Sequence, residues 1–248
     1  MSQSDRIRAV ILTTQRTGST FLVECLRSHP EIECAGEILI GVPEVILGPR
    51  YRGRFQSLYK LWNIAKTGAW LPGNRMERFF SSGEAKVRVF KAMYNQLANP
   101  FALRYLRGHK EIRVIHLCRE NLLKVHVSRL LMPKRLQLQA TSPVEPVWVH
   151  VDPAKAIAAM RKAQERHEYF ERLFERHARL PISYEKLIDG ASLQADSARR
   201  ICDFLGVAQY PMKSKLVKVN PESLRDTVTN YDELASVVSR TEFADTLA

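Results

Sequence analysis

The stretch that most constrains the fold is AVILTTQRTGSTFLVECL, residues 9–26. It begins with an apolar run, continues through a short polar turn and ends with apolar residues at helical spacing. The run at 10–12 suits a strand that is covered on both faces, whereas the apolar residues from Phe21 to Leu26 suit one face of a helix. The sequence therefore predicts a strand, a loop of phosphate size and a helix within an α/β fold.

The loop at residues 14–20 has the composition of an anion site. A helix N-terminus offers free backbone N–H groups and the positive end of its dipole, and Gly18 lets the backbone approach a ligand closely. Ser19 and Thr20 add hydroxyl donors, and Arg16 can grip a tetrahedral oxyanion through paired hydrogen bonds. We expect a ligand that carries phosphate or sulfate. The alternative is an ordinary helix cap made by Ser19 or Thr20.

Two familiar nucleotide-binding motifs do not match this loop. The Walker loop needs a lysine before its hydroxyl residue, and this chain reads Gly18-Ser19-Thr20. The dinucleotide fingerprint needs several glycines, and the turn contains one.

A carboxylate follows the next predicted strand. Residues 31–34 can form a short strand that leads into Ala35-Gly36-Glu37. Ligands of parallel α/β sheets bind outside the carboxyl ends of the strands, so Glu37 and Arg16 would share one site. Glu37 could there act as a general base. The alternative is a solvated loop glutamate.

The segment RTGSTFLVECLRSHPEIECAGE, residues 16–37, resembles sulfotransferases that use 3′-phosphoadenosine 5′-phosphosulfate (PAPS), in particular the tyrosylprotein and bacterial carbohydrate branches. The resemblance implies a P-loop-like parallel sheet flanked by helices, with PAPS as the donor. It also implies that Arg16 and Glu37, 21 residues apart, serve the transfer. The residues that it places at the 5′-phosphosulfate are Arg16, Thr17, Gly18, Ser19, Thr20 and Phe21.

A second matching block is IRVIHLCRENLLKVHVSRLL, residues 112–131, which reads as a strand over 112–118 and a helix over 121–131. By resemblance, Arg119 and Ser128 bind the 3′-phosphate of the donor. Their separation of nine residues is one more than is common in the family. Without the resemblance, Ser128 reads as a helical surface serine.

Three further residues match the family. Tyr184, in PISYEKL, would contact the adenine, although a half-buried core tyrosine is the alternative. Lys91, at the end of a strand predicted over 85–93, would contact the transferring group unless it faces water. Lys218 begins a segment that resembles the donor-closing segment of the family, and its alternative is solvated surface.

The length of 248 residues fits one domain, residues 1–248. We expect a variable acceptor-side insertion at about 42–84, where basic and aromatic residues mix, and a mobile loop at about 132–152. The alternative for the insertion is a helical segment that packs its aromatic residues on the core. A long helix is predicted over 153–179, opened by Asp152 and Pro153, and another over 195–205.

Composition limits the remaining classes. Four separated cysteines indicate reduced core residues, and seven histidines without ligand spacing predict no metal. No apolar stretch is long enough to span a membrane and no apolar signal core precedes the first strand, so we expect a cytoplasmic protein. The net charge of +12 suits either nucleic acid or a small polyanionic ligand.

The function that these patterns favour is transfer of a sulfuryl group from PAPS to a hydroxyl or amine of a carbohydrate, glycolipid or other small metabolite, with no nucleic-acid partner. One alternative is a nucleotide-dependent phosphotransferase with an atypical loop, which would need magnesium. Another is a noncatalytic protein that binds nucleic acid through its positive charge. The pairing of Arg16 with Glu37 favours the first, because phosphate binding alone gives no reason for a carboxylate beside the anion.

Overall fold

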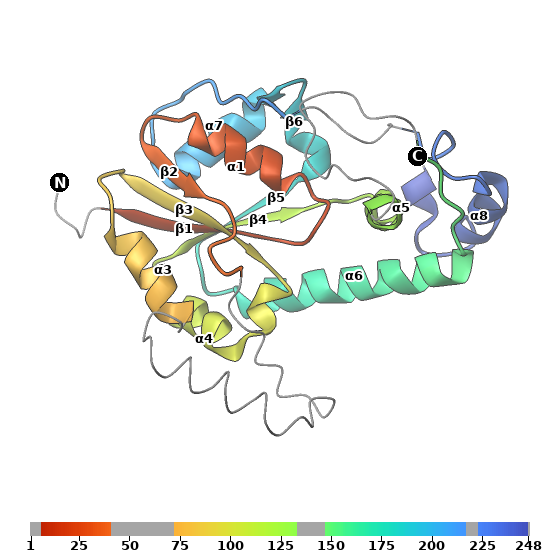
Figure 1. Ribbon diagram of the computed structural model, residues 1–248, viewed down its shortest axis with the longest axis horizontal. Helices are drawn as coiled ribbons and strands as arrows, with labels where there is room; N and C mark the ends of the chain where they lie inside the picture. The colour runs from red at the N-terminus through yellow and green to blue at the C-terminus, as the bar shows by residue number, and fades with distance from the viewer. Residues whose placement is uncertain (1–5, 41–71, 133–146, 217–222, 248) are drawn as a thin grey trace.

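The computed structural model describes residues 6–40, 72–132, 147–216 and 223–247. At its centre is a five-stranded sheet in the order β2-β3-β1-β4-β5, and every neighbouring pair is parallel (Figure 1). This confirms the predicted α/β fold, a parallel sheet flanked by helices. The strands are β1 Ile7–Thr13, β2 Ile32–Ala35, β3 Val87–Met93, β4 Arg113–Cys118 and β5 Arg179–Ser183. A small antiparallel pair joins β6 Ile188–Asp189 to β7 Ser192–Leu193.

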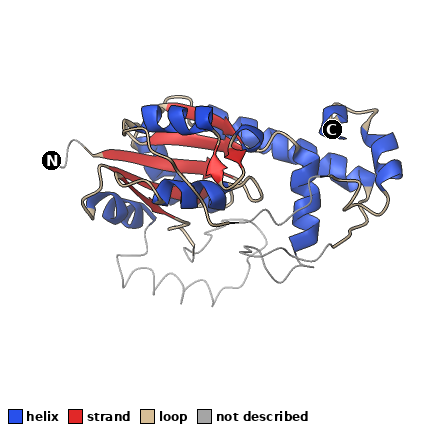
Figure 2. Ribbon diagram, turned by 90° about the horizontal axis from the view of Figure 1, so that it is seen from above, coloured by secondary structure: helices blue, strands red, loops and turns tan. Residues whose placement is uncertain are grey.

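Helices cover both faces of the sheet (Figure 2). The core on one face includes residues of α1 Ser19–Arg27 and α7 Ala195–Leu205. The core on the other includes residues of α3 Pro72–Ser81, α4 Pro100–Gly108 and the last turn of α6 Pro153–Leu173. A third cluster joins the first half of α6 to α5 Leu122–Leu131 and α8 Tyr231–Val238. Three short 3-10 helices complete the described elements: η2 Gln96–Ala98, η4 Tyr184–Lys186 and η5 Ala244–Leu247.

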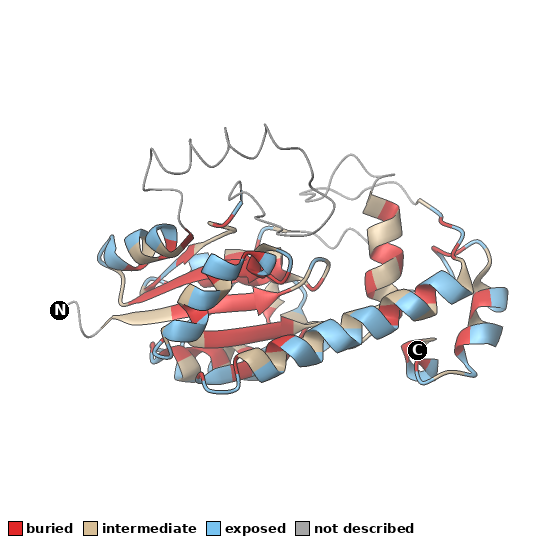
Figure 3. Ribbon diagram, turned by 90° about the horizontal axis from the view of Figure 1, so that it is seen from below, coloured by how far each residue is buried: buried red, intermediate tan, exposed pale blue. Residues whose placement is uncertain are grey.

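From Ala9 onward strand β1 is buried on both faces, as its apolar run predicts (Figure 3). Ala9 and Ile11 face the α1 side, whereas Val10 and Leu12 face the α3 side. Burying each large aliphatic side chain contributes about 1.5–3 kcal/mol, so this strand anchors both cores. Its rigidity fixes the position of the loop that follows it.

The parallel arrangement brings four loops to one edge of the sheet. In register, Thr13 at the end of β1 lies opposite Met93 of β3 and Leu117 of β4. The segments that follow β1, β2, β3 and β4 therefore leave the sheet on the same side, where ligands of such sheets bind.

The long helix is only partly as predicted. Asp152 caps it, because its Oδ1 accepts hydrogen bonds from the N–H groups of Ala154 and Lys155, and Pro153 occupies the first turn. The predicted end at residue 179 is wrong, since α6 ends at Leu173. The chain must turn there to enter β5, and the buried side chains of Phe174 and His177 anchor that turn. The helix predicted over 195–205 is confirmed, and Gly206 ends it at φ 66°.

Two expected irregular segments lie largely outside the described residues. Of the insertion at 42–84, the described part begins with α3, a regular helix that buries Met76 and Phe80. Of the loop at 132–152, the described end pairs Val149 with Val228 in a single bridge. Within the described residues, no helix has the length and apolar character needed to cross a membrane.

The four cysteines are free thiols. Cys25, Cys34 and Cys202 are buried, as predicted for core residues, and Cys118 is half-buried at the end of β4. Burial raises the pKa of the Cys25 and Cys34 thiols to about 12, so both stay protonated and inert at neutral pH.

Candidate active site

The loop after β1 is braced from within. The Oγ1 of Thr13 donates to the carbonyl of Leu117 and lies 2.6 Å from the Oγ1 of Thr17. Thr17 is buried and its hydroxyl is also 2.9 Å from the carbonyl oxygen of Thr14. Its side chain therefore shapes the loop and does not point to a ligand.

Gly18 starts helix α1 without a side-chain cap. It is the N-cap residue at φ 75°, and the helix has no side-chain cap hydrogen bond. The alternative of a cap made by Ser19 or Thr20 is therefore wrong. The first turn also lacks acidic residues, so its N–H groups and dipole are available to an anion. The Phe21 side chain is buried in the core, which leaves only its backbone for ligand contact.

Arg16 has the one left-handed backbone conformation among the described non-glycine residues, at φ 68°. Such a conformation costs about 1–2 kcal/mol for an L-residue, and it persists here inside a braced loop. The strained backbone presents a long side chain whose Nε donates to the Ser128 Oγ at 2.7 Å. The strained backbone of Arg16 therefore occurs together with a guanidinium that is held in place by Ser128.

Ser128 is buried, so the alternative of a surface serine is wrong. Arg119 follows β4 and its Nη1 lies 3.4 Å from the carbonyl oxygen of Arg16, which brings all three predicted residues together. Burial lowers the pKa of Arg119, yet a guanidinium remains charged at neutral pH. Its Nε is 3.8 Å from the Glu185 Oε1, a loose ion pair, so Nη2 is the guanidinium nitrogen outside these two contacts.

Tyr184 completes this group from the end of β5. Its ring lies 4.6 Å from the Arg119 Cζ, in a cation–π contact, and it packs against the backbone of Gly18. Tyr184 is half-buried at the site itself. The predicted donor-binding residue Lys218 lies outside the described residues.

Glu37 and Lys91 form a second group. Lys91 lies within β3, not at its end, and its side chain is only 7% exposed, so the alternative of a lysine facing water is wrong. Its Nζ is 3.0 Å from the Glu37 Oε1. Because β1 and β3 are neighbours, with Ile11 opposite Lys91, this ion pair lies on the strand next to the anion loop. Glu37 is therefore not a solvated loop residue.

Sequence reasoning missed two residues that contact the predicted ones. Gln96 accepts a hydrogen bond from the Met93 N–H through Oε1 and donates through Nε2 to the Glu37 Oε2 at 2.7 Å. Arg129, next to Ser128, donates from Nη2 to the Thr14 Oγ1 at 3.1 Å. Gln96 is three residues beyond β3, and its place just after a strand end was the available signal.

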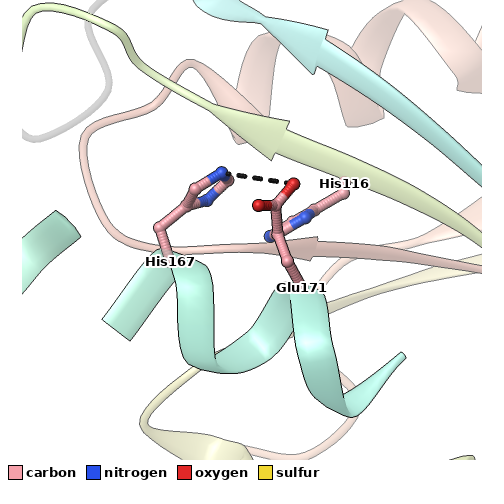
Figure 4. A group of neighbouring side chains, drawn as sticks. All are labelled: His116, His167 and Glu171. Atoms are coloured by element: carbon pink, nitrogen blue, oxygen red, sulfur yellow. Dashed lines mark ion pairs between the residues drawn. The ribbon is translucent and has the colours of Figure 1, made fainter. Parts of the chain in front are cut away.

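A cluster of titratable residues lies between β4 and α6 (Figure 4). The rings of His116 and His167 stack at 4.6 Å, and the Tyr94 hydroxyl lies 2.5 Å and 3.2 Å from nitrogens of the two rings. The His167 Nε2 is 3.7 Å from the Glu171 Oε1. Burial lowers the pKa of His116 to about 3, so it is neutral at neutral pH.

Of the described residues, His116, His167 and Glu171 form the one group that could hold a metal ion. Two imidazoles and a carboxylate suit zinc. However, their possible ligand atoms spread over as much as 4.8 Å, and the Tyr94 hydroxyl already engages both rings. We assign this cluster to a hydrogen-bonded connection between β4 and α6. The absence of a metal cofactor stays a prediction.

The fold and this site define an α/β protein whose anion loop is joined by arginines and, on the next strand, by a carboxylate–lysine pair. A model of the Sulfotransferase family matches residues 9–211, so the chain belongs to that family. The crystal structure of the sulfotransferase from Alicyclobacillus acidocaldarius is similar, with a TM-score of 0.50 and 16% sequence identity over 98% of this chain and 96% of that chain. At this identity the likeness supports the fold. No curated protein matches the chain.

Proposed function

We propose that the protein transfers a sulfuryl group from PAPS to a hydroxyl or amine of a carbohydrate, glycolipid or other small metabolite. The observation that carries this proposal is the contact of Arg16, in the anion loop, with both Ser128 and Arg119, beside the Glu37–Lys91 pair. One side of the site thus offers donors for two separated phosphates. The other side offers a base and a cation for the reacting group.

Donor binding follows from these contacts. The N–H groups at the start of α1 would hold the 5′-phosphate, with Arg16 beside it. Arg119 and Ser128 would hold the 3′-phosphate, and Tyr184 would contact the adenine. The Arg119 Nη1 lies 3.4 Å from the backbone carbonyl of Arg16, so a bound polyanion would meet positive charge from both residues at this loop. Lys218 would add a contact to the donor.

The transfer itself is an in-line displacement. The acceptor oxygen or nitrogen forms a bond to sulfur as the bond from sulfur to the 5′-phosphate oxygen breaks, and 3′-phosphoadenosine 5′-phosphate (PAP) leaves. Glu37 takes the acceptor proton. Arg16 offsets negative charge that develops on the leaving phosphate, and Lys91 does so on the sulfuryl oxygens. Lys91 must then share its ammonium between the donor and Glu37.

The same contacts give less support to the two alternative functions. A magnesium-dependent phosphotransferase needs a free carboxylate beside the loop. Among the described residues, Glu37 is engaged by Lys91 and Gln96, and Glu185 accepts from the N–H groups of Glu120 and Asn121. A nucleic-acid surface gains nothing from a carboxylate beside its phosphate contacts.

Ligand stabilisation tests the proposal. PAP should raise the melting temperature of the full chain, because a ligand at ~100 times its dissociation constant adds about 2.7 kcal/mol of stability. ATP with magnesium should stabilise less. An equal or larger shift with ATP and magnesium would favour the phosphotransferase, and no shift with PAP would contradict a PAPS-dependent enzyme.

A further inference from the structure

Arg129 reaches the anion loop from a side that the proposed donor contacts do not use. It follows Ser128 on α5, and its Nη2 donates to the Thr14 Oγ1 at 3.1 Å. Thr14 is the first residue after β1, at the start of the loop. Arg16 and Ser128 meet further along the same loop. Ser128 and Arg129, adjacent on α5, therefore contact the loop at separate points, Arg16 and Thr14.

No carboxylate among the described residues neutralises the positive charge of Arg129. Its Nε is fully buried and has no hydrogen-bond partner. Ion pairs connect Arg8 to Glu77, Arg88 to Glu33 and Arg119 to Glu185, but in the described ranges no carboxylate pairs with Arg129. Arg129 as a whole is half-buried, and a charge that is partly removed from water without a countercharge is unfavourable, so a bound anion would stabilise it.

The surroundings of Arg129 increase this imbalance. Burial lowers its pKa first, and the nearby guanidinium of Arg166 on α6 lowers it further. Burial also lowers the pKa of His126, and Arg129 adds to that effect. Arg129 still carries its proton at neutral pH, because a guanidinium cannot be deprotonated under protein conditions. A positive region thus lies between α5, α6 and the start of the loop.

We propose that Arg129 binds an oxyanion beside Thr14, separate from the two phosphates of the donor. This oxyanion is either the sulfuryl group of PAPS or an anionic group on the acceptor, and both have the tetrahedral or planar oxygens that a guanidinium recognises. The inference rests on the proposed function, since it takes the loop as the donor site. If Arg129 binds an anionic group on the acceptor, then the acceptor is a negatively charged molecule and not a neutral sugar or amine.

Three ligands separate the possibilities in calorimetry with the full chain and its Arg129→Gln variant. PAP carries the two phosphates, PAPS adds the sulfuryl group, and inorganic sulfate added to the PAP-saturated protein probes the remaining anion site. We expect PAP affinity to stay within about twofold, because its contacts are elsewhere. A loss of tenfold or more for PAPS would assign Arg129 to the sulfuryl group. The same loss for sulfate alone would assign it to the acceptor side.

Other results would overturn the inference. PAPS affinity that stays within twofold, with sulfate binding either unchanged or absent from both proteins, leaves Arg129 without an oxyanion. An equal loss for PAP and PAPS would mean that Arg129 belongs to the phosphate contacts or to the scaffold. If the unchanged protein fails to bind PAP, the proposed function fails first, and this result is visible before any variant is made.

Two controls separate binding from folding and from net charge. The melting temperature of the ligand-free Arg129→Gln variant should be unchanged or higher, because the substitution removes a half-buried charge that no carboxylate of the described residues neutralises. A clear decrease would indicate a structural role, which overturns the inference. Arg172→Gln removes the same charge from an exposed position on α6 that pairs with Glu168, and all three affinities should stay within twofold.

Discussion

The ring of Tyr184 packs so closely against Gly18 that a Cβ on Gly18 would lie 2.4 Å from the Tyr184 Cδ2. The tyrosine after β5 and the glycine at the start of α1 therefore fix each other's positions, although 166 residues separate them. In the proposed function, this contact couples the adenine contact to the loop that holds the 5′-phosphate.

Gly18→Ala should destabilise the chain by about 2–4 kcal/mol, because the alanine would adopt a left-handed conformation and would also clash with the ring. Urea denaturation gives this difference. Gly190→Ala is the matched control, since Gly190 also has a positive φ of 56° but has nothing within 4 Å of a Cβ. Gly190→Ala should lose only the stability that the left-handed backbone conformation costs an alanine. Adding Tyr184→Ala to Gly18→Ala should recover part of the loss. Equal costs at both glycines would contradict the close contact.

Glu37→Gln should reduce single-turnover sulfuryl transfer by about 10²–10⁴-fold, the usual effect of removing a general base. PAP affinity should hold or rise slightly, because one negative charge leaves the site. Both quantities are measured on the same variant once an acceptor is found. Retention of more than about a tenth of the rate would remove Glu37 from the role of base.

Gln96 is predicted to position Glu37. Met93 fixes the orientation of the Gln96 amide, so Nε2 points at the carboxylate. Gln96→Ala should lower turnover by tenfold or more and leave PAP affinity unchanged, because a misplaced base affects the transfer step alone. Gln209→Ala, which removes a surface amide bonded to Asp203, should change neither quantity. Normal turnover in Gln96→Ala would show that Lys91 is sufficient to hold Glu37.

Arg119→Ala should weaken PAP binding at least tenfold, because a hydrogen bond to a charged group is worth roughly 1.5–3 kcal/mol. Adenosine 5′-phosphosulfate, which lacks the 3′-phosphate, should bind the variant and the unchanged protein about equally. Calorimetry with both ligands measures the difference. Equal losses would mean that Arg119 acts through its contacts with Tyr184 and Glu185.

His116 should make stability depend on pH in the acidic range. Its pKa is lowered by burial to about 3 in the folded chain, whereas an unfolded histidine titrates near pH 6.5. Between these values the unfolded chain binds the extra proton, so stability falls as pH decreases from about 6.5, by up to about 1.4 kcal/mol per unit. His116→Gln should flatten this slope in denaturation curves at pH 7 and pH 5. The exposed His150→Gln should leave it unchanged.

The sequence predicted best those elements that are determined by neighbouring residues along the chain. The apolar run before Gly18 predicted β1, the loop and α1, and Asp152-Pro153 predicted the start of α6. The end of α6 was missed because Phe174 continues the apolar helical spacing, whereas in the structure its burial anchors the turn that follows Leu173.

Residues that depend on three-dimensional neighbours were harder to predict. The place of Gln96 just after a strand end puts it at the ligand edge of the sheet, but the sequence does not indicate that it bonds to Glu37, 59 residues earlier. Arg129 reads as a solvated cation until α5 is placed beside the start of the loop. The family resemblance supplied Ser128 and Lys91, and local patterns alone would have left both on the surface.

The strand order has a consequence for the biogenesis of the site. Since β3 inserts between β1 and β2, the ion pair of Glu37 with Lys91 joins segments that are 54 residues apart. Chains are made from the N-terminus, and contacts between distant segments close slowly. A nascent chain that ends before residue 87 has the anion loop and the carboxylate, but it lacks the lysine between them. We therefore expect the nascent chain to have no transfer activity until β3, with Lys91, has been synthesised and has paired with β1 and β2.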